Sequence, residues 1–191
     1  MKTTIGMLLL LTLAVISAGC SKSESSFEPN TFSNQDMCIV KKNDKQAAIC
    51  YGMTRAKAEE IAGIEMDSQV AVFSNYSSGL KIFYRDNAVA GVALVEGSEG
   101  AYETARGAEL GMSRSEIMKL YGEEYAITET ERNLDYAYDT TANKFSNKTE
   151  AGGKSQGESQ SIYLFSSFYS GEEQKAETLF LIDRKMAVFM N

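Results

Sequence analysis

The sequence predicts an α+β domain in which a β-hairpin precedes a tandem repeat of a short helix followed by an antiparallel β-meander. Three observations predict it: a turn-centred segment between two cysteines, two capped amphipathic segments, and apolar runs separated by turn residues. The composition agrees, because 43% of the 191 residues are apolar and 24% are charged, as in folded domains.

The first expected element is a hairpin between Cys38 and Cys50. The segment has apolar ends and the turn-forming centre Asn43-Asp44, so that the two cysteines face each other when it closes. Outside the cytoplasm such a pair favours a disulfide, and we expect a structural bridge. The alternative is a catalytic redox pair, for which C-x-x-C spacing is typical.

A short motif then occurs twice. G-M-T-R at 52–55 returns as G-M-S-R at 111–114, and each copy precedes an amphipathic run that ends in a glycine. Two matches at one offset indicate an internal duplication. We therefore expect one domain over 37–191, with repeat 1 at about 51–98 and repeat 2 at about 110–191.

Each copy begins with a residue suited to cap a helix. Thr54 and Ser113 stand at the expected N-caps, and Ser113 with Glu116 makes a capping box. Gly63 and Gly122 suit the C-caps. Helices this short are stable only when packed on other structure, which we expect to be the following sheets.

Apolar runs bounded by turn residues predict the strands. Repeat 1 is expected to supply strands at 70–74, 80–85 and 88–95, and repeat 2 strands at 134–139, 161–169, 177–183 and 185–190. The polar, Gly- and Ser-rich segment 140–160 is expected to be a mobile hairpin loop. Contact of this loop with a partner is the alternative, because long loops are often functional.

Two windows of the sequence resemble a known family. The run Y-E-T-A-R-G-A-E-L-G-M-S-R-S-E-I-M-K-L-Y-G at 102–122, echoed by Y-G-M-T-R-A-K-A-E-E-I-A-G at 51–63, resembles bacterial lipoproteins of the β-lactamase-inhibitor-protein-like and small outer-membrane-assembly-lipoprotein fold group. The Pro that commonly follows the helix-ending glycine is replaced by Ile64 and Glu123. The resemblance implies a tandem α+β architecture that presents a sheet face to a protein partner.

The first twenty residues predict export. An apolar run over Ile5–Ile16, too short to span a bilayer, leads into the small residues of S-A-G-C at 17–20. S-A-G-C resembles a bacterial lipobox, in which the cysteine is acylated; the alternative is secretion after cleavage near Ala18. We expect a signal peptide over 1–19 and a lipid-modified Cys20, attached to the bacterial cell membrane or outer membrane and facing outside the cytoplasm.

Residues 20–36 are expected to form a flexible tether. They are rich in Ser, Thr and Asn, contain the chain's one Pro, and show neither a helical nor a strand period. Phe27 and Phe32 are the exceptions, and we expect them to dock loosely on the domain where the chain enters it.

The composition argues against several kinds of function. The chain has no His, the usual base of hydrolases and the commonest metal ligand, and its net charge of −7 disfavours nucleic acid. Asp135, Asp139, Asp183 and Glu123-Glu124 lack the spacing of a catalytic pair or a Ca²⁺ site. We therefore expect no enzyme activity, no cofactor and no metal site.

Aromatic side chains give the clearest indication of function. They alternate along two predicted strands, so both faces of the second sheet carry bulky rings. The candidate partner surface consists of Tyr136, Tyr138, Tyr163, Phe165 and Tyr169. One face can be core and the other a contact surface. The alternative is that a helix, the tether or the first repeat covers it.

Together these patterns predict a membrane-anchored cell-envelope lipoprotein that acts as a non-catalytic protein-binding module. Its partners would be the bilayer, through Cys20, and a protein of the envelope. The alternative is a lipoprotein that binds cell-wall glycan or a small ligand, which needs an enclosed pocket instead of an open sheet face. An enzyme would need two carboxylates that converge in a cleft.

Overall fold

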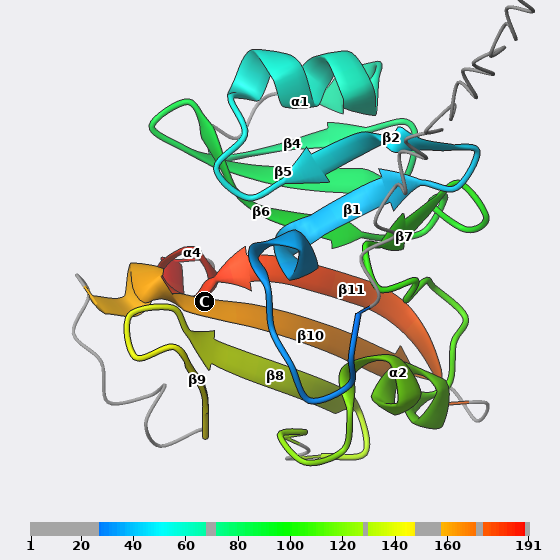
Figure 1. Cartoon of the computed structure of the whole chain (residues 1–191). Coiled ribbons are helices and arrows are strands. Elements are labelled where there is room, and N and C mark those ends of the chain that lie inside the picture. Colours follow the sequence, from blue (N-terminus) through cyan, green and yellow to red (C-terminus); the bar gives the residue numbers. More distant parts are fainter. Residues whose placement is uncertain (1–26, 68–71, 128–129, 148–157, 171–173, 190–191) are drawn as a thin grey trace, which may run out of the picture.

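The computed structural model describes residues 27–67, 72–127, 130–147, 158–170 and 174–189. Within these ranges the chain is an α+β domain with two antiparallel sheets and three α-helices (Figure 1). The expected signal peptide and Cys20 lie outside the described residues. No helix in the described part of the chain is long and apolar enough to cross a bilayer.

The predicted hairpin is present and belongs to a three-stranded sheet. β1 (Cys38–Lys41) pairs with β2 (Asp44–Cys50), and Cys38 lies opposite Cys50 and forms a disulfide with it. The other edge of β1 pairs with β7 (Tyr102–Thr104), a strand that the sequence does not predict. A 3₁₀ turn, η1 (Asn34–Met37), leads into β1.

Removal of the disulfide is expected to destabilise the domain. Replacing both cysteines, Cys38→Ser with Cys50→Ser, frees a loop of 12 residues in the unfolded chain. The free energy of unfolding should fall by about 3 kcal/mol. Urea unfolding of this variant beside the wild type measures the loss, and a loss below about 1 kcal/mol would contradict it.

An eight-stranded antiparallel sheet forms the centre of the molecule, in the order β3-β4-β5-β6-β11-β10-β8-β9. Its strands are β3 (Glu65–Asp67), β4 (Phe73–Tyr76), β5 (Leu80–Arg85), β6 (Ala88–Leu94), β8 (Asn133–Asp139), β9 (Lys144–Ser146), β10 (Ile162–Ser170) and β11 (Lys175–Asp183). The sequence predicts all of these except β3 and β9. β9 lies inside the segment 140–160, so the expectation of a loop throughout that segment is wrong; residues 148–157 lie outside the described residues.

Three helices flank the sheets: α1 (Arg55–Ala62), α2 (Arg114–Tyr121) and α4 (Arg184–Phe189). The first two are the capped helices that the sequence predicts. The segment of α4 reads as a strand in the sequence, and this prediction is wrong. Asp183 explains the difference, because its Oδ1 accepts a hydrogen bond from the backbone N of Met186 at 2.8 Å and so caps a helix.

The N-termini of α1 and α2 are capped differently. Ser113 forms a complete capping box with Glu116, whereas the side chain of Thr54 makes no capping hydrogen bond. Ser113→Ala is therefore expected to cost about 1 kcal/mol in urea unfolding, and Thr54→Ala less than about 0.5 kcal/mol. Equal effects of the two substitutions would contradict the capping argument.

The capping box also predicts a pH dependence. Hydrogen bonds from the backbone and side chain of Ser113 lower the pKa of Glu116. A carboxyl whose pKa is lowered by folding stabilises the fold above its unfolded pKa and loses that contribution as the pH falls through the lowered value. The difference between wild type and Ser113→Ala should therefore shrink on acidification. Urea unfolding at neutral and at acidic pH checks this.

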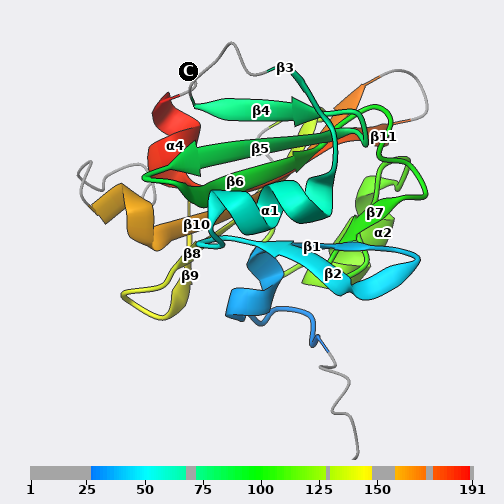
Figure 2. The same ribbon diagram turned by 90° about the horizontal axis from the view of Figure 1, so that it is seen from above.

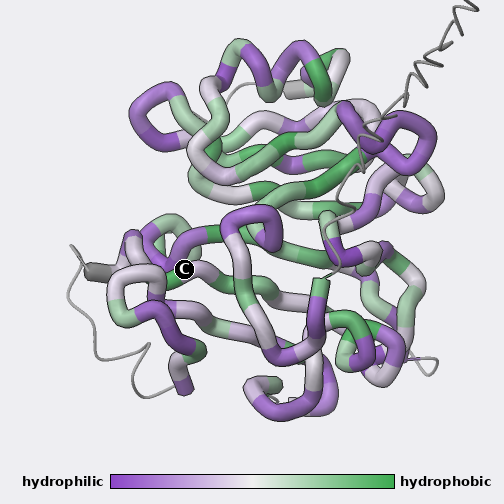
Figure 3. The backbone as a smooth tube through the Cα atoms, viewed as in Figure 1, coloured by the Kyte–Doolittle hydropathy of each residue, from purple (hydrophilic) through white to green (hydrophobic). Residues whose placement is uncertain are grey.

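The three-stranded sheet, α1 and α2 cover one face of the eight-stranded sheet, and α4 packs on the other (Figure 2). The covered face forms the larger core, which includes Ile39, Ile49, Ala58, Leu80, Ile82, Val92, Leu94, Ile117, Leu134, Phe165, Leu179 and Leu181. On the other face, Met186 of α4 packs in a smaller core with Phe83, Ala90, Ala93 and Ile182. Figure 3 shows hydrophobic residues along the central strands and hydrophilic residues in the loops.

The two Gly–Met motifs make the same backbone contacts. The glycine N of Gly52-Met53 donates to Val89 O and the methionine O accepts from Val89 N, each at 2.8 Å. Gly111-Met112 bonds Ala176 through the same two atoms, again at 2.8 Å. Val89 lies near the start of β6 and Ala176 near the start of β11, so both motifs hold corresponding places in the sheet.

The strands β6 and β11 are neighbours. Their register is symmetric about the pair Ala93 and Phe180, which lie equally far along the chain from Val89 and Ala176. Ala93 faces Phe180, with Leu94 opposite Leu179 on one side and Val92 opposite Leu181 on the other. These two strands therefore join the first four strands of the sheet to the last four.

Candidate functional site

The acidic residues that the sequence singles out either make hydrogen bonds within the fold or lie exposed at the surface. Asp183 is fully buried, Asp139 accepts two backbone hydrogen bonds from the turn after β8, and Asp135 accepts one from the side chain of Asn133. Glu123-Glu124 are exposed after α2. Among the described residues, no group of three or more His, Cys, Asp and Glu side chains is placed to hold a metal ion.

Asp183 joins three parts of the chain. Its Oδ2 accepts hydrogen bonds from Tyr51 Oη at 2.7 Å and from Arg85 Nη2 at 2.5 Å, and its Oδ1 accepts the capping bond of α4. The hydrogen bond to Asp183 raises the pKa of Arg85, and burial followed by the bond to Asp183 raises the pKa of Tyr51. Tyr51 therefore stays protonated and donates, and the network fixes α4 to β5 and to the residue after the hairpin.

The aromatic surface that the sequence proposes for a partner belongs largely to the core. Tyr136, Phe165 and Tyr169 are buried in the larger core, and Tyr138 and Tyr163 are half-buried beside it. The structure thus brings the five side chains to one region, as expected, but covers them. The alternative of a covered face is the arrangement that the structure has.

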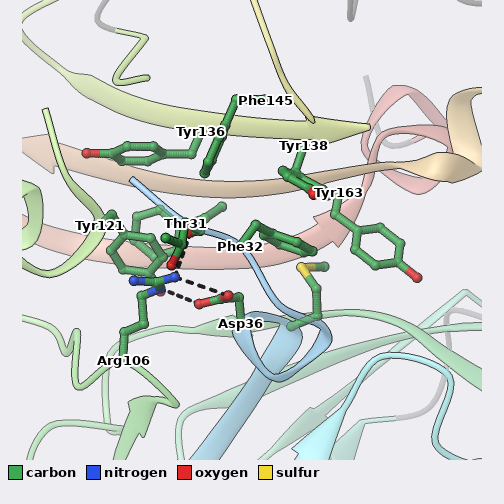
Figure 4. A pocket seen from close by; sticks show the side chains of 11 residues that line it. Thr31, Phe32, Asp36, Arg106, Tyr121, Tyr136, Tyr138, Phe145 and Tyr163 are labelled. Atoms are coloured by element: carbon green, nitrogen blue, oxygen red, sulfur yellow. Dashed lines mark hydrogen bonds and ion pairs between the residues drawn. The ribbon is translucent and has the colours of Figure 1, made fainter. Parts of the chain in front are cut away.

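The segment before β1 provides part of this cover. The ring of Phe32 stacks on Tyr138 with centroids 4.0 Å apart and lies 6.0 Å from the ring of Tyr163. The space enclosed among these rings is about 20 Å³, room for about one water molecule (Figure 4). The expectation of a flexible tether over 20–36 is therefore wrong for its described part, residues 27–36.

A buried ion pair holds this segment on the domain. Arg106 Nε donates to Asp36 Oδ1, and the two side chains are only 2% and 3% exposed. Arg106 also donates to the carbonyl oxygens of Glu28 at 2.9 Å and Thr31 at 2.7 Å. Figure 4 shows Arg106 and Asp36 pointing toward each other beneath the ring of Tyr121.

The opposite face of the large sheet carries a second set of aromatic side chains. Phe73, Phe83, Phe180 and Phe168 lie on β4, β5, β11 and β10. Successive rings are 5.8, 6.3 and 5.7 Å apart between centroids, so they form a continuous row across the sheet. β6 lies within this row and contributes only the small side chain of Ala93 opposite Phe180.

The aromatic row and α4 border two neighbouring hollows. One, of about 390 Å³, is lined by Val72, Phe73, Lys81, Phe83, Phe180 and Phe189. The other, of about 250 Å³, is lined by Val72, Tyr84, Arg85, Lys185, Met186 and Phe189. Both hollows share Val72 and Phe189, and together they are called the open-face groove below. Phe189 is 69% exposed, so its ring is accessible to a ligand.

No family model, curated protein or solved structure matches this chain. The open-face groove is therefore the candidate functional site on the strength of its own geometry. The sequence does not reveal it, because its lining comes from β4, β5, β11 and a helix that reads as a strand. The one local signal is the aromatic pair Phe168-Tyr169, whose members point to opposite faces of β10, one exposed and one buried.

Proposed function

We propose that this chain is a membrane-anchored lipoprotein of the bacterial cell envelope whose domain binds a protein partner without catalysis. Cys20 would carry the lipid anchor, as the lipobox-like S-A-G-C at 17–20 suggests. The disulfide between Cys38 and Cys50 supports an oxidising compartment outside the cytoplasm. The open-face groove would be the binding site.

The observation that carries the binding proposal is the accessible apolar rim of the groove. Phe189, which lines both hollows, is 69% exposed, and Phe168, whose ring lies beside that of Phe180, is 45% exposed. Monomeric soluble proteins rarely expose apolar groups together unless these groups make a contact. Aromatic side chains are also the residues that most often anchor protein interfaces.

We further propose that the two helix–sheet units are copies of one ancestral unit. The matching contacts of Gly52-Met53 and Gly111-Met112 and the symmetric register of β6 and β11 support this. The groove then lies at the junction of the copies, because Phe83 comes from the first and Phe180 from the second. A sheet face offered to a protein is also what the family resemblance implies.

Binding of a cell-wall glycan or a small ligand is less well supported. An enclosed pocket would favour it, but the enclosed space beside Phe32 is about 20 Å³. Ligand pockets typically have volumes of about 300–1,000 Å³. The open-face groove has such a volume but is a surface feature, which favours a protein.

Site-specific photo-cross-linking in native envelopes tests the proposal. A photoreactive phenylalanine analogue is placed at Phe168 or Phe189. A matched control carries it at Gln46, an exposed position on β2, which lies on the other face of the eight-stranded sheet. We expect the same protein adduct from Phe189, which lines the groove, and from Phe168 in the adjoining aromatic row, and not from the control. Cys20→Ala should move the protein out of the membrane fraction.

Three results would contradict the proposal. Adducts that form equally from all three positions would show collision without a site. A carbohydrate adduct at Phe168 and Phe189, without a protein adduct, would show that the ligand is a glycan and not a protein. Retention of the Cys20→Ala variant in the membrane fraction would contradict the proposed lipid anchor at Cys20.

A further inference from the structure

The open-face groove combines aromatic walls with positive charge. Among the described residues that line it, Lys81, Arg85 and Lys185 are the charged ones, and none of them is acidic. This is opposite to the chain as a whole, which has 26 acidic and 19 basic residues. The groove is therefore a local positive region on an acidic protein.

Two of these cations remain available to a ligand. Arg85 is bound to the buried carboxylate of Asp183, but Lys81 and Lys185 form no ion pair with any residue that the structure describes. Lys81 Nζ lies 4.8 Å from the ring centroid of Phe73, a cation–π contact that holds the ammonium group beside the aromatic wall. Lys185 is exposed on α4. Lys81 lines one hollow and Lys185 the other, so a carboxylate in either hollow meets a positive charge.

We infer that the open-face groove binds an extended peptide segment of its partner in which apolar and acidic residues alternate. This inference rests on the proposed function and specifies the chemistry of the partner. Two adjoining hollows, separated by Phe189 and Val72, suit two apolar side chains on one face of an extended chain. Acidic side chains of the segment reach Lys81 and Lys185 at the rim.

A membrane surface fits the same groove less well. The body of the protein is acidic, which opposes approach to anionic lipid. The segment that leads back toward Cys20 also lies on the other face of the large sheet, with η1 and Phe32 (Figure 2). The groove therefore faces away from the side on which the described chain begins.

Calorimetric titration of the full-length protein in detergent micelles tests the inference with synthetic peptides. The probe is an eight-residue peptide that alternates Leu and Glu. One comparison peptide has Lys in place of Glu, and another has Ser in place of Leu. We expect the Leu–Glu peptide to bind at least about tenfold more tightly than either, because both charge and apolar contact are needed.

Matched variants assign the binding to the groove. Lys81→Glu with Lys185→Glu should weaken the Leu–Glu peptide about tenfold and favour the Leu–Lys peptide. Lys57→Glu, an exposed position on α1, should leave the affinity within about twofold. Phe189→Ser should weaken binding, whereas Val188→Ser, the exposed neighbour that does not line the groove, should not. Circular dichroism confirms that each variant is folded.

Equal affinity for the Leu–Glu and Leu–Lys peptides would overturn the inference, as would unchanged binding by the double lysine variant. Binding to phosphatidylglycerol vesicles through the same lysines, without binding to any peptide, would replace the peptide by a membrane. If cross-linking at Phe168 and Phe189 still captures a protein while the peptide preference fails, the partner chemistry is wrong and the proposed function stands. If cross-linking fails as well, both are wrong.

Discussion

Asp183→Ala is expected to lower the free energy of unfolding by about 3–5 kcal/mol, because it removes a fully buried carboxylate and leaves the partly buried guanidinium group of Arg85 without its partner. Arg85 would lose both hydrogen bonds to the carboxylate, and Tyr51 would lose its acceptor. The same change removes the cap of α4. Urea unfolding measures the loss, and hydrogen exchange should show α4 opening before the sheet.

A matched control for this variant lies on the same strand. Glu177→Ala changes an exposed carboxylate of β11 and should alter the free energy of unfolding by less than about 0.5 kcal/mol. Asp183→Asn should fall between wild type and Asp183→Ala, because the amide keeps one acceptor but not the charge. A loss below about 1 kcal/mol for Asp183→Ala would contradict the role of the network.

Asp36→Ala is expected to have a similarly large effect. It would leave the guanidinium group of Arg106 buried without a carboxylate, at a cost of about 3–5 kcal/mol. The segment around Phe32 would also lose its main attachment, and the rings of Tyr138 and Tyr163 would become accessible. Urea unfolding measures the first effect, and limited proteolysis within residues 27–36 measures the second.

The control for Asp36→Ala is Glu28→Ala in the same segment. The side chain of Glu28 is exposed, and its contact with Arg106 is made by the backbone carbonyl, which the substitution keeps. We expect wild-type stability and wild-type resistance to proteolysis. If Glu28→Ala and Asp36→Ala were equally sensitive to protease, the ion pair would not be what holds the segment.

The local elements of this fold are largely predictable from the sequence. The hairpin register follows from the cysteines that face each other and from Asn43 in the turn, although Asp44, also expected in the turn, is the first residue of β2 and pairs with Lys41. α2 follows from the capping box of Ser113. The prediction for the segment of α4 is wrong because Met186 and Val188 alternate with other residues as in a strand. Asp183, which caps the helix, also fits the end of β11. A local pattern cannot decide between the two.

The candidate site is less predictable, because it depends on which face of the sheet is covered. Asp36 and Arg106 are 70 positions apart, so nothing local indicates that they pair and hold a covering segment. The alternation in β10 correctly separates Phe165 from Phe168, but it does not say which of the two faces is core. That choice is made by β1, β2 and η1, which come from another part of the chain.

The buried ion pair of Asp36 and Arg106 also limits how far the domain can lie from a lipid anchor at Cys20. Together with the ring of Phe27, whose centroid lies 5.1 Å from the guanidinium carbon of Arg106, it fixes the chain from residue 27 onward. With the proposed anchor at Cys20, about seven residues connect the anchor to the fixed part of the chain. An extended chain spans at most about 3.5 Å per residue. The domain would then stay within roughly 25 Å of the lipid headgroups, whereas a free chain over 20–36 would allow roughly 60 Å. Such a lipoprotein meets partners that come to its own membrane and does not reach across a wide gap to find them.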